Sequence, residues 1–189
     1  MLNDGFRVRS AEQSDGLELA RLRWDFTLED DADEAIESRR TFTERFTESW
    51  TSFCESGRWF VAVAEHVAID GRLLGCAWLE TVDRVPRPIP HADEMGYITN
   101  VYVEPAWRNH GIGTDLLRVV VSQAQSRGFG ELFVWPSDAS VEFYKRVGFS
   151  LSHEVHEMSL NGPDLPSAPC SSSSSRKRVK RPVEVDFAD

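Results

Sequence analysis

The chain has 189 residues and a formal net charge of −10, and 41% of its residues are hydrophobic. This length and composition predict one soluble globular domain with room for a short second element. The acidic balance disfavours a nucleic-acid binder and favours cationic partners such as amines. No apolar run approaches the roughly 18 residues needed to span a bilayer, and the polar start is not that of a signal peptide. The three cysteines are odd in number and widely spaced, which indicates free thiols and a cytoplasmic location.

The first part of the chain predicts a strand and two helices. Residues 6–9 indicate a short strand, and Ser14 or Asp15 can start a helix. The apolar residues of that helix are Leu17, Ala20, Leu22 and Trp24. The acidic run 29–34 is expected to form a turn and the charged first turn of the second helix. That helix carries a stripe at helical spacing, made of Phe42, Phe46, Trp50 and Phe53. The stripe indicates core packing, and both helices are also candidates for the walls of a substrate pocket.

The middle of the chain predicts a β-hairpin followed by a loop. The apolar runs 58–66 and 72–82 indicate strands buried on both faces, joined by a turn at Asp70–Gly71. Between 83 and 96 the prolines alternate with other residues, which excludes a helix and disfavours a central strand. We expect a loop there, and loops beside a buried sheet often carry specificity.

From residue 97 onward, strands alternate with helices. Residues 97–103 and 131–135 are predicted strands, and a helix from Gly111 to about Arg127 lies between them, closed by Gly128 as a left-handed cap. A short helix is expected at 137–147, and one or two final strands at 149–160. His153 and His156 lie three residues apart in a predicted strand and point to opposite faces, so no metal site is predicted.

After Leu160 the composition changes to a tail rich in proline and serine. Such a composition indicates a disordered or loosely packed segment. Its basic cluster "RKRVKR" leaves polyanion binding or a localisation role as an alternative. The sequence therefore predicts a domain at 1–160 and a flexible basic tail at 161–189. The tail carries a net charge of +1, which leaves −11 on the domain.

The stretch "RNHGIGT", 108–114, stands between the strand 97–103 and the following helix. A helix N-terminus presents unpaired N–H groups at the positive end of a dipole, and glycines let a phosphate approach them. Arg108 would add charge, and Thr114 a hydroxyl donor. Thr114 and Asp115 follow the last glycine where a nucleoside-triphosphate loop needs Lys and then Ser or Thr. A dinucleotide fingerprint would need a third glycine at position 116, which is Leu. The pattern Arg/Gln-x-x-Gly-x-Gly/Ala fits fully, and a plain turn with glycines for packing remains the alternative.

The segments "GYITNVYVEPAWRNHGIGTDLL" and "VEFYKRVGF" together resemble the GNAT superfamily of acetyl-CoA-dependent N-acetyltransferases. The resemblance covers roughly residues 5–160 and is strongest over 96–149. It implies an α/β fold with a mixed, mostly antiparallel central sheet flanked by helices. Acetyl-CoA is then expected at a split between the strands 97–103 and 131–135. Ser137 and Ser140 stand where family members often have Asn and Ala. The residues that the resemblance assigns to acetyl-CoA are Val101, Tyr102, Val103, Arg108, Asn109, His110, Gly111, Ile112, Gly113, Thr114, Ser137 and Ser140.

Thioester aminolysis requires a neutral amine, a donor for the developing oxyanion and a proton for the leaving thiolate. Tyr144 matches the family's tyrosine and is the candidate acid. A backbone N–H near Tyr102 or Val103 is the candidate oxyanion donor. Some relatives place a glutamate base where this chain has Tyr97, so Glu80, at the end of a strand facing the cleft, is the first candidate base. Other candidate bases are Glu94, Asp93, His91 and a chain of water molecules. Asn100 can orient the acceptor or satisfy a backbone group.

The predicted function is acetyl transfer from acetyl-CoA to a primary amine of a small molecule or peptide, by direct attack and without a metal. A non-catalytic acyl-CoA-binding or regulatory module of the same fold is the alternative, because no base is obvious. No membrane contact is expected, nucleic acid would be bound only through the basic tail, and a homodimer is compatible with the sequence.

Overall fold

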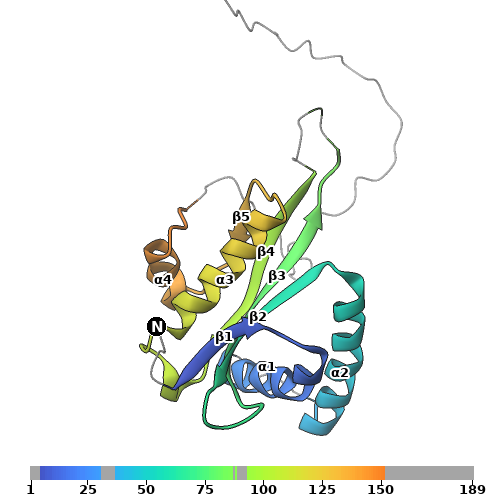
Figure 1. Ribbon diagram of the computed structural model, residues 1–189, viewed down its shortest axis with the longest axis vertical. Coiled ribbons are helices and arrows are strands. Elements are labelled where there is room, and N and C mark those ends of the chain that lie inside the picture. The colour runs from blue at the N-terminus through green and yellow to red at the C-terminus, as the bar shows by residue number, and fades with distance from the viewer. Residues whose placement is uncertain (1–4, 31–36, 87, 89–92, 152–189) are drawn as a thin grey trace, which may run out of the picture. The chain divides into compact units, whose positions relative to one another are not determined.

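The computed structural model describes residues 5–30, 37–86, 88 and 93–151. These residues form a five-stranded sheet with helices on both faces (Figure 1). The elements are β1 Phe6–Ser10, a 3₁₀ turn at Gln13–Asp15, α1 Gly16–Asp30, α2 Arg39–Ser56, β2 Trp59–His66, β3 Leu73–Asp83, β4 Glu94–Val103, a 3₁₀ turn at Pro105–Trp107, α3 Ile112–Ser126, β5 Leu132–Val134, a 3₁₀ turn at Asp138–Ser140, and α4 Val141–Arg146.

The sheet is mixed and mostly antiparallel, which confirms the expected fold. The strand order is β1-β2-β3-β4-β5, and every neighbouring pair is antiparallel except β4 and β5. The parallel pair is joined through α3, as a parallel connection requires a crossover. The turn between β2 and β3 contains Gly71 at a positive φ of 69°, as the Asp70–Gly71 prediction requires.

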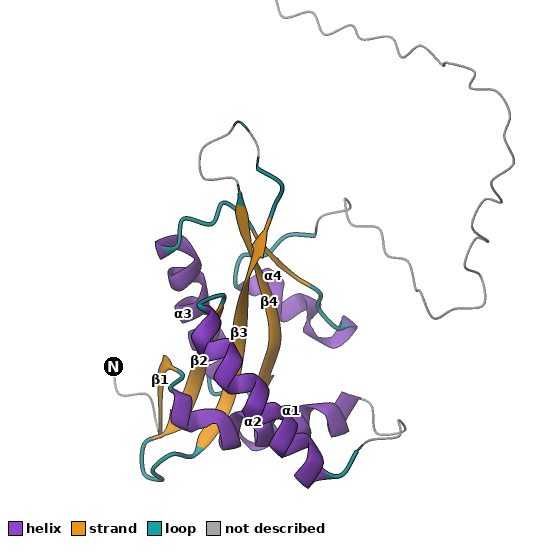
Figure 2. Ribbon diagram, turned by 90° about the vertical axis from the view of Figure 1, so that its right-hand side faces the viewer, coloured by secondary structure: helices purple, strands orange, loops and turns teal. Residues whose placement is uncertain are grey.

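The two faces of the sheet carry different cores. On one face, α3 and α4 cover a mainly aliphatic cluster with Ile98, Leu116 and Tyr144. On the other face, α1 and α2 cover a cluster rich in aromatic rings around Trp78. Figure 2 looks onto this second face, with α1 and α2 in front of the strands. The predicted aromatic stripe of α2 is confirmed as core packing, because Trp50 is buried and Phe46 and Phe53 pack beside it.

Two details of the helical region differ from the expectation. The acidic run does not supply the first turn of α2, which contains no acidic residue. Ser38 caps α2 instead, accepting a hydrogen bond from the backbone N–H of Thr41, while Glu29 and Asp30 end α1. Leu17 is 67% exposed, so it is not part of the core face of α1. The predicted strands after residue 151 and the tail lie outside the described residues.

Candidate functional site

The loop between β4 and α3 adopts a backbone that few side chains tolerate. Asn109 has a φ of 65° and Gly111 has a φ of 85°, both in the left-handed region. Gly111 caps α3, and the first helical hydrogen bond runs from the Asp115 N–H to its carbonyl at 3.1 Å. The N–H groups of Ile112, Gly113 and Thr114 therefore precede the first bond of the helix and can donate to an anion.

The two glycines of the motif serve different purposes. A Cβ on Gly111 would meet no atom within 4 Å, so the space beside this residue is open. A Cβ on Gly113 would lie 3.2 Å from the ring of Phe143, so this glycine brings α3 close to α4. Gly111 is thus required by its φ and leaves room for a ligand, whereas Gly113 is required by packing.

Arg108 is turned back toward β4 and the end of α1. Its Nε donates to the carbonyl of Val103 at 3.0 Å, and its two terminal nitrogens meet the two carboxylate oxygens of Glu29 at 2.7 and 2.8 Å. This hydrogen bond to Arg108 holds the pKa of the Glu29 carboxyl below its usual range. The guanidinium also lies 5.7 Å from the centre of the Tyr102 ring. Any phosphate at the loop would compete with Glu29 for Arg108.

The remaining loop residues act through the backbone or lie at the surface. The side chain of Ile112 is buried in the α3 core, so only its N–H faces the loop. His110 Nδ1 lies 2.9 Å from the carbonyl of Arg108 and braces the turn. Asn109 and His110 are exposed, and Thr114 is half-buried.

The pairing between β4 and β5 ends halfway along β4. Their pairing covers only Gly96–Ile98 against Leu132–Val134, and β5 ends there. The second half of β4, Thr99–Val103, is therefore hydrogen-bonded to β3 alone among the described strands. This is the expected split between the two strands.

A β-bulge lies in the second half of β4. Trp78 faces Thr99, but Cys76 faces Tyr102, so two residues of β4 oppose Ala77 alone. Asn100 has a φ of 48° at this point, and its side chain contacts Arg23 at 3.3 Å and the Cys76 sulfur at 3.8 Å. Asn100 thus fixes the bulge from the α1 face.

The register beyond the bulge decides which amides face the split. The Glu104 N–H donates to the Leu74 carbonyl at 2.9 Å, and hydrogen-bonded pairs alternate along an antiparallel ladder. The backbone of Tyr102 therefore faces β3, while the N–H groups of Val101 and Val103 point into the split. The register thus selects Val103, and adds Val101, as the candidate oxyanion donor in place of Tyr102.

Tyr144 is buried in the same cluster that Val101 and Val103 border, with 8% of its surface exposed. The rings of Phe143 and Phe149 lie 5.3 and 5.6 Å from its ring. Burial, together with the nearby Tyr97, raises the pKa of Tyr144 to about 12. The phenol therefore keeps its proton throughout the neutral pH range.

Glu80 lies directly opposite Tyr97 in the ladder between β3 and β4. Leu79 belongs to the α3 core, and Thr81 accepts a hydrogen bond from Arg127, which follows α3 as its C-cap, so strand alternation places Glu80 on the opposite face. Glu80 is half-buried, and within the described ranges its carboxylate makes no hydrogen bond or salt bridge. Arg58 is close enough that Asp83, and to a smaller extent Glu80, raise the pKa of its guanidinium. An unpaired carboxylate of this kind can accept a proton or hold an ammonium.

The other candidate bases are less enclosed. Glu94 begins β4 and is exposed, and Asp93 is exposed just before it. His91 lies outside the described residues.

Ser137 and Ser140 lie in the turn that leads into α4. Their hydroxyls form a hydrogen bond with each other at 3.1 Å, and the Ser140 hydroxyl also donates to the Ser137 carbonyl at 2.9 Å. These hydroxyls brace the turn.

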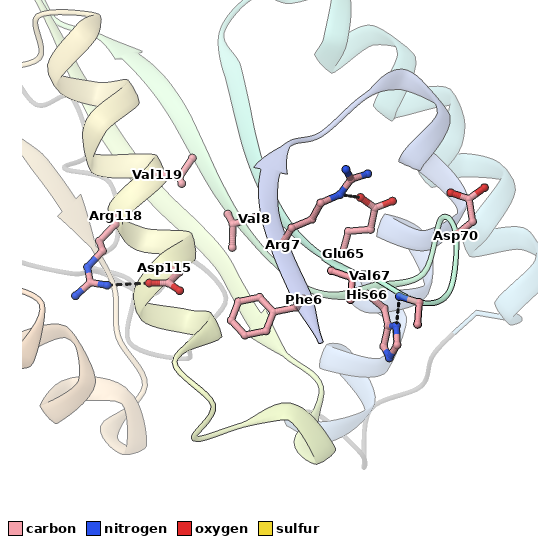
Figure 3. Close-up of a pocket in the computed structure, with 11 residues that line it drawn as sticks. Phe6, Arg7, Val8, Glu65, His66, Val67, Asp70, Asp115, Arg118 and Val119 are labelled. Atoms are coloured by element: carbon pink, nitrogen blue, oxygen red, sulfur yellow. Dashed lines mark hydrogen bonds and ion pairs between the residues drawn. The ribbon is translucent and has the colours of Figure 1, made fainter. Parts of the chain in front are cut away.

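A separate hollow of about 810 Å³ lies between β1, the hairpin of β2 and β3, and α3 (Figure 3). None of the predicted site residues lines it. Four of its charged side chains form ion pairs, Arg7 with Glu65 and Asp115 with Arg118. This hollow therefore offers no evident set of reacting groups.

The sequence did not predict two features of the site, the bulge in β4 and the pairing of Glu29 with Arg108. The bulge had a signal, because asparagine is uncommon inside strands and tolerates a left-handed φ. Glu29 had none, because its partner Arg108 is 79 residues away in the chain.

Among the residues that the structure describes, no group of three or more His, Cys, Asp or Glu side chains could hold a metal ion. No helix in the described ranges is both long and apolar enough to cross a membrane.

Comparisons with known proteins agree with this geometry. Residues 18–149 match the model of the acetyltransferase (GNAT) family. An uncharacterized N-acetyltransferase of Methanocaldococcus jannaschii is 30% identical over 77 residues, which cover 39% of this chain and 30% of that protein. Glucosamine 6-phosphate N-acetyltransferase of Trypanosoma brucei brucei is 30% identical over 84 residues, which cover 44% of this chain and 54% of the enzyme. The chain thus matches only about a third to a half of these relatives' length.

Solved structures share the fold over most of the chain. The crystal structure of a predicted acetyltransferase from Clostridium acetobutylicum with acetyl-CoA superposes with a TM-score of 0.68 and 24% identity, covering 82% of this chain and 96% of that one.

Proposed function

Because the chain belongs to the acetyltransferase (GNAT) family, we propose that it transfers the acetyl group of acetyl-CoA to a primary amine of a small molecule or peptide. One observation carries this proposal: β4 loses its β5 partner where a bulge turns two backbone N–H groups outward. The same stretch of chain leads directly into the open N-terminus of α3.

The donor would lie along this stretch. Its diphosphate would accept hydrogen bonds from the N–H groups of residues 112–114, at the positive end of α3. Its pantetheine arm would pair with the backbone of Val101 and Val103, in place of the missing strand. The thioester would then reach the bulge and Tyr144. The relative solved with acetyl-CoA supports this choice of donor.

The reaction forms one bond and breaks one. The amine nitrogen attacks the thioester carbonyl carbon, and the N–H of Val101 or Val103 stabilises the oxyanion. The new C–N bond is kept when the oxyanion collapses, the C–S bond breaks, and the released thiolate takes a proton. The surplus proton of the attacking nitrogen goes to a base.

Tyr144 is the proposed donor of the thiolate's proton. A free thiol has a pKa of about 8.5. With the Tyr144 pKa at about 12, the phenol is a weaker acid than the free thiol by about 3.5 pKa units, so full proton transfer to the thiolate is uphill. Burial also raises the pKa of a thiol in the same site, which narrows this gap.

Glu80 is the proposed base. An alkyl ammonium has a pKa of about 10.4, so at neutral pH most of the acceptor must lose a proton before attack. Glu80 lies beside Tyr97, on the sheet face opposite α3, and within the described ranges it forms no salt bridge, since the nearby Arg58 is paired with Asp83. A water molecule between Glu80 and the amine would serve the same end.

We assign this activity to residues 1–160 and treat 161–189 as a separate basic tail. Three widely spaced cysteines support a cytoplasmic location, and Cys54 and Cys76 are free thiols.

A binding experiment tests the donor site first. Gly111→Asn places a side chain in the open space beside the loop, and asparagine tolerates the left-handed φ. We expect calorimetry to show acetyl-CoA binding weakened at least about tenfold. Gly57→Asn is the matched control, since Gly57 has a φ of 66° and equally open surroundings at the end of α2. Equal affinity in both variants would contradict the donor site.

An activity screen tests the transfer itself. Wild-type protein and acetyl-CoA are incubated with pooled amines and peptides, and free thiol is measured. Thiol release that depends on an amine supports the enzyme. Tight acetyl-CoA binding without thiol release across the panel would favour the non-catalytic module.

A further inference from the structure

Three aromatic side chains meet where β4 and β5 are still paired. The rings of Tyr97 and Phe133 are stacked, with centres 4.8 Å apart and an angle of 18° between their planes. Trp135 stands edge-on to both, at 4.9 Å and 67° from Tyr97 and at 5.2 Å and 81° from Phe133. We call these three residues the aromatic corner, because its two walls are nearly perpendicular.

The corner lies on the same sheet face as Glu80. Ile98 and Val134 belong to the α3 side of the core, so alternation places Tyr97 and Phe133 on the other face. Trp135 is 54% exposed, although large aromatic side chains are usually well covered. The Trp135 ring is thus open to a ligand from solvent, while Tyr97 and Phe133 are half-buried beside it.

Charge around the corner favours a cation. Glu80 is the direct cross-strand neighbour of Tyr97, and its Cβ is expected about 5 Å away. Nearby arginines are already engaged, since Arg58 pairs with Asp83 and Arg84 pairs with Glu131. An aromatic surface beside an unpaired carboxylate attracts ammonium groups through the ring quadrupoles.

We propose that the aromatic corner binds a second ammonium group of the acceptor, so that the preferred substrates are linear diamines and polyamines. This inference rests on the proposed function. The corner lies about 10 Å along β4 from the bulge, since Asn100 is three positions after Tyr97. An extended diamine spans most of that distance, which lets one nitrogen lie in the corner beside Glu80 while the other approaches the thioester at the bulge.

Acetyl transfer gives the first test. Cadaverine, a linear diamine, is compared with pentylamine, the monoamine of the same length. We expect wild-type kcat/KM to favour cadaverine about tenfold or more. Trp135→Leu should raise the KM for cadaverine about fivefold and leave kcat and both pentylamine constants unchanged. Trp135→Phe keeps a ring at the position and should retain most of the preference.

A second test does not depend on turnover. The indole N–H resonance of Trp135, assigned by its loss in Trp135→Phe, is followed by NMR while cadaverine is added without acetyl-CoA. We expect this resonance to shift with saturation, and pentylamine to shift it only at much higher concentration.

The two tests separate this inference from the proposed function. A shifted Trp135 resonance without thiol release would support the ammonium subsite while contradicting the enzyme. Thiol release with a silent Trp135 resonance, or equal losses for both amines in Trp135→Leu, would overturn the subsite and leave the enzyme standing.

Discussion

The two halves of β4 differ in how many strands they contact. Gly96–Ile98 is paired with β3 on one side and β5 on the other, whereas Thr99–Val103 is paired with β3 alone in the described part of the sheet. The first half is regular, and the second contains a bulge and a residue at positive φ. One strand thus combines a structural segment with a segment whose backbone donors are left for a ligand.

Packing around the paired half shows how closely it is held. A Cβ on Gly96 would lie 2.4 Å from Leu132 and 2.8 Å from Leu79, both from neighbouring strands. Leu79 is fully buried, so it has little room to move. Substitutions in this half should therefore change stability, and those around the open half should change ligand binding or turnover.

The largest effect should follow from Gly96→Val. Its side chain would overpack the junction of β3, β4 and β5, and we expect the free energy of unfolding to fall by about 3 kcal/mol. Denaturant titration measures this loss. Gly130→Val is the matched control, because a Cβ there meets no atom within 4 Å, and it should cost much less. Equal losses in the two variants would show that the paired half is less tightly packed than the distances indicate.

Tyr144→Phe should separate chemistry from stability at the open half. The ring stays in its aromatic surroundings while the proton donor is lost, so we expect kcat to fall about 100-fold. The acetyl-CoA dissociation constant from calorimetry should stay within about twofold. An unchanged kcat would reduce Tyr144 to a packing residue.

The pH profile tests the same group. With a Tyr144 pKa of about 12, the phenol is protonated at lower pH, so its ionisation should cause no loss of kcat up to pH 10. An alkaline loss with a midpoint near pH 9 that disappears in Tyr144→Phe would show that the bound substrate lowers this pKa.

Much of the fold could be predicted from local patterns. The glycine at the hairpin turn and the glycine caps of α3 depend on neighbours in sequence, and they lie where expected. The strands also lie near their predicted places, but β4 begins at Glu94, inside the predicted loop 83–96. The acidic run was predicted to supply the first turn of α2, because carboxylates favour a helix start. That prediction was wrong: Ser38 caps α2, and Glu29 of the acidic run pairs with Arg108 instead.

Less of the candidate site than of the fold could be predicted from the sequence. The motif located the loop between β4 and α3, but it did not distinguish Gly111, beside open space, from Gly113, packed on Phe143. Which amides of β4 face the split depends on a bulge that shifts the register by one residue. The aromatic corner joins Tyr97 to residues 36 and 38 positions later, a contact that only the parallel pairing of β4 with β5 creates.

The smallest effect concerns Arg108, which links the open half to α1 through the Val103 carbonyl and Glu29. If Arg108 must turn to the diphosphate, Glu29→Gln removes a competing partner. Because the side chains of Arg108 and Glu29 are each about 40% exposed, we expect acetyl-CoA to bind Glu29→Gln only about threefold more tightly than wild type. Calorimetry at low salt measures this gain, which should shrink as salt screens the charges.

Glu142→Gln is the control for this change, since it removes an equally negative, exposed carboxylate from α4. Arg108 lowers the pKa of Glu29, so the carboxylate stays charged and the gain should be constant above pH 5, and it should vanish as acid protonates Glu29 in the wild type. Binding weakened about tenfold or more in Glu29→Gln would mean the opposite arrangement, in which Glu29 holds Arg108 in place while the backbone amides of α3 alone contact the diphosphate.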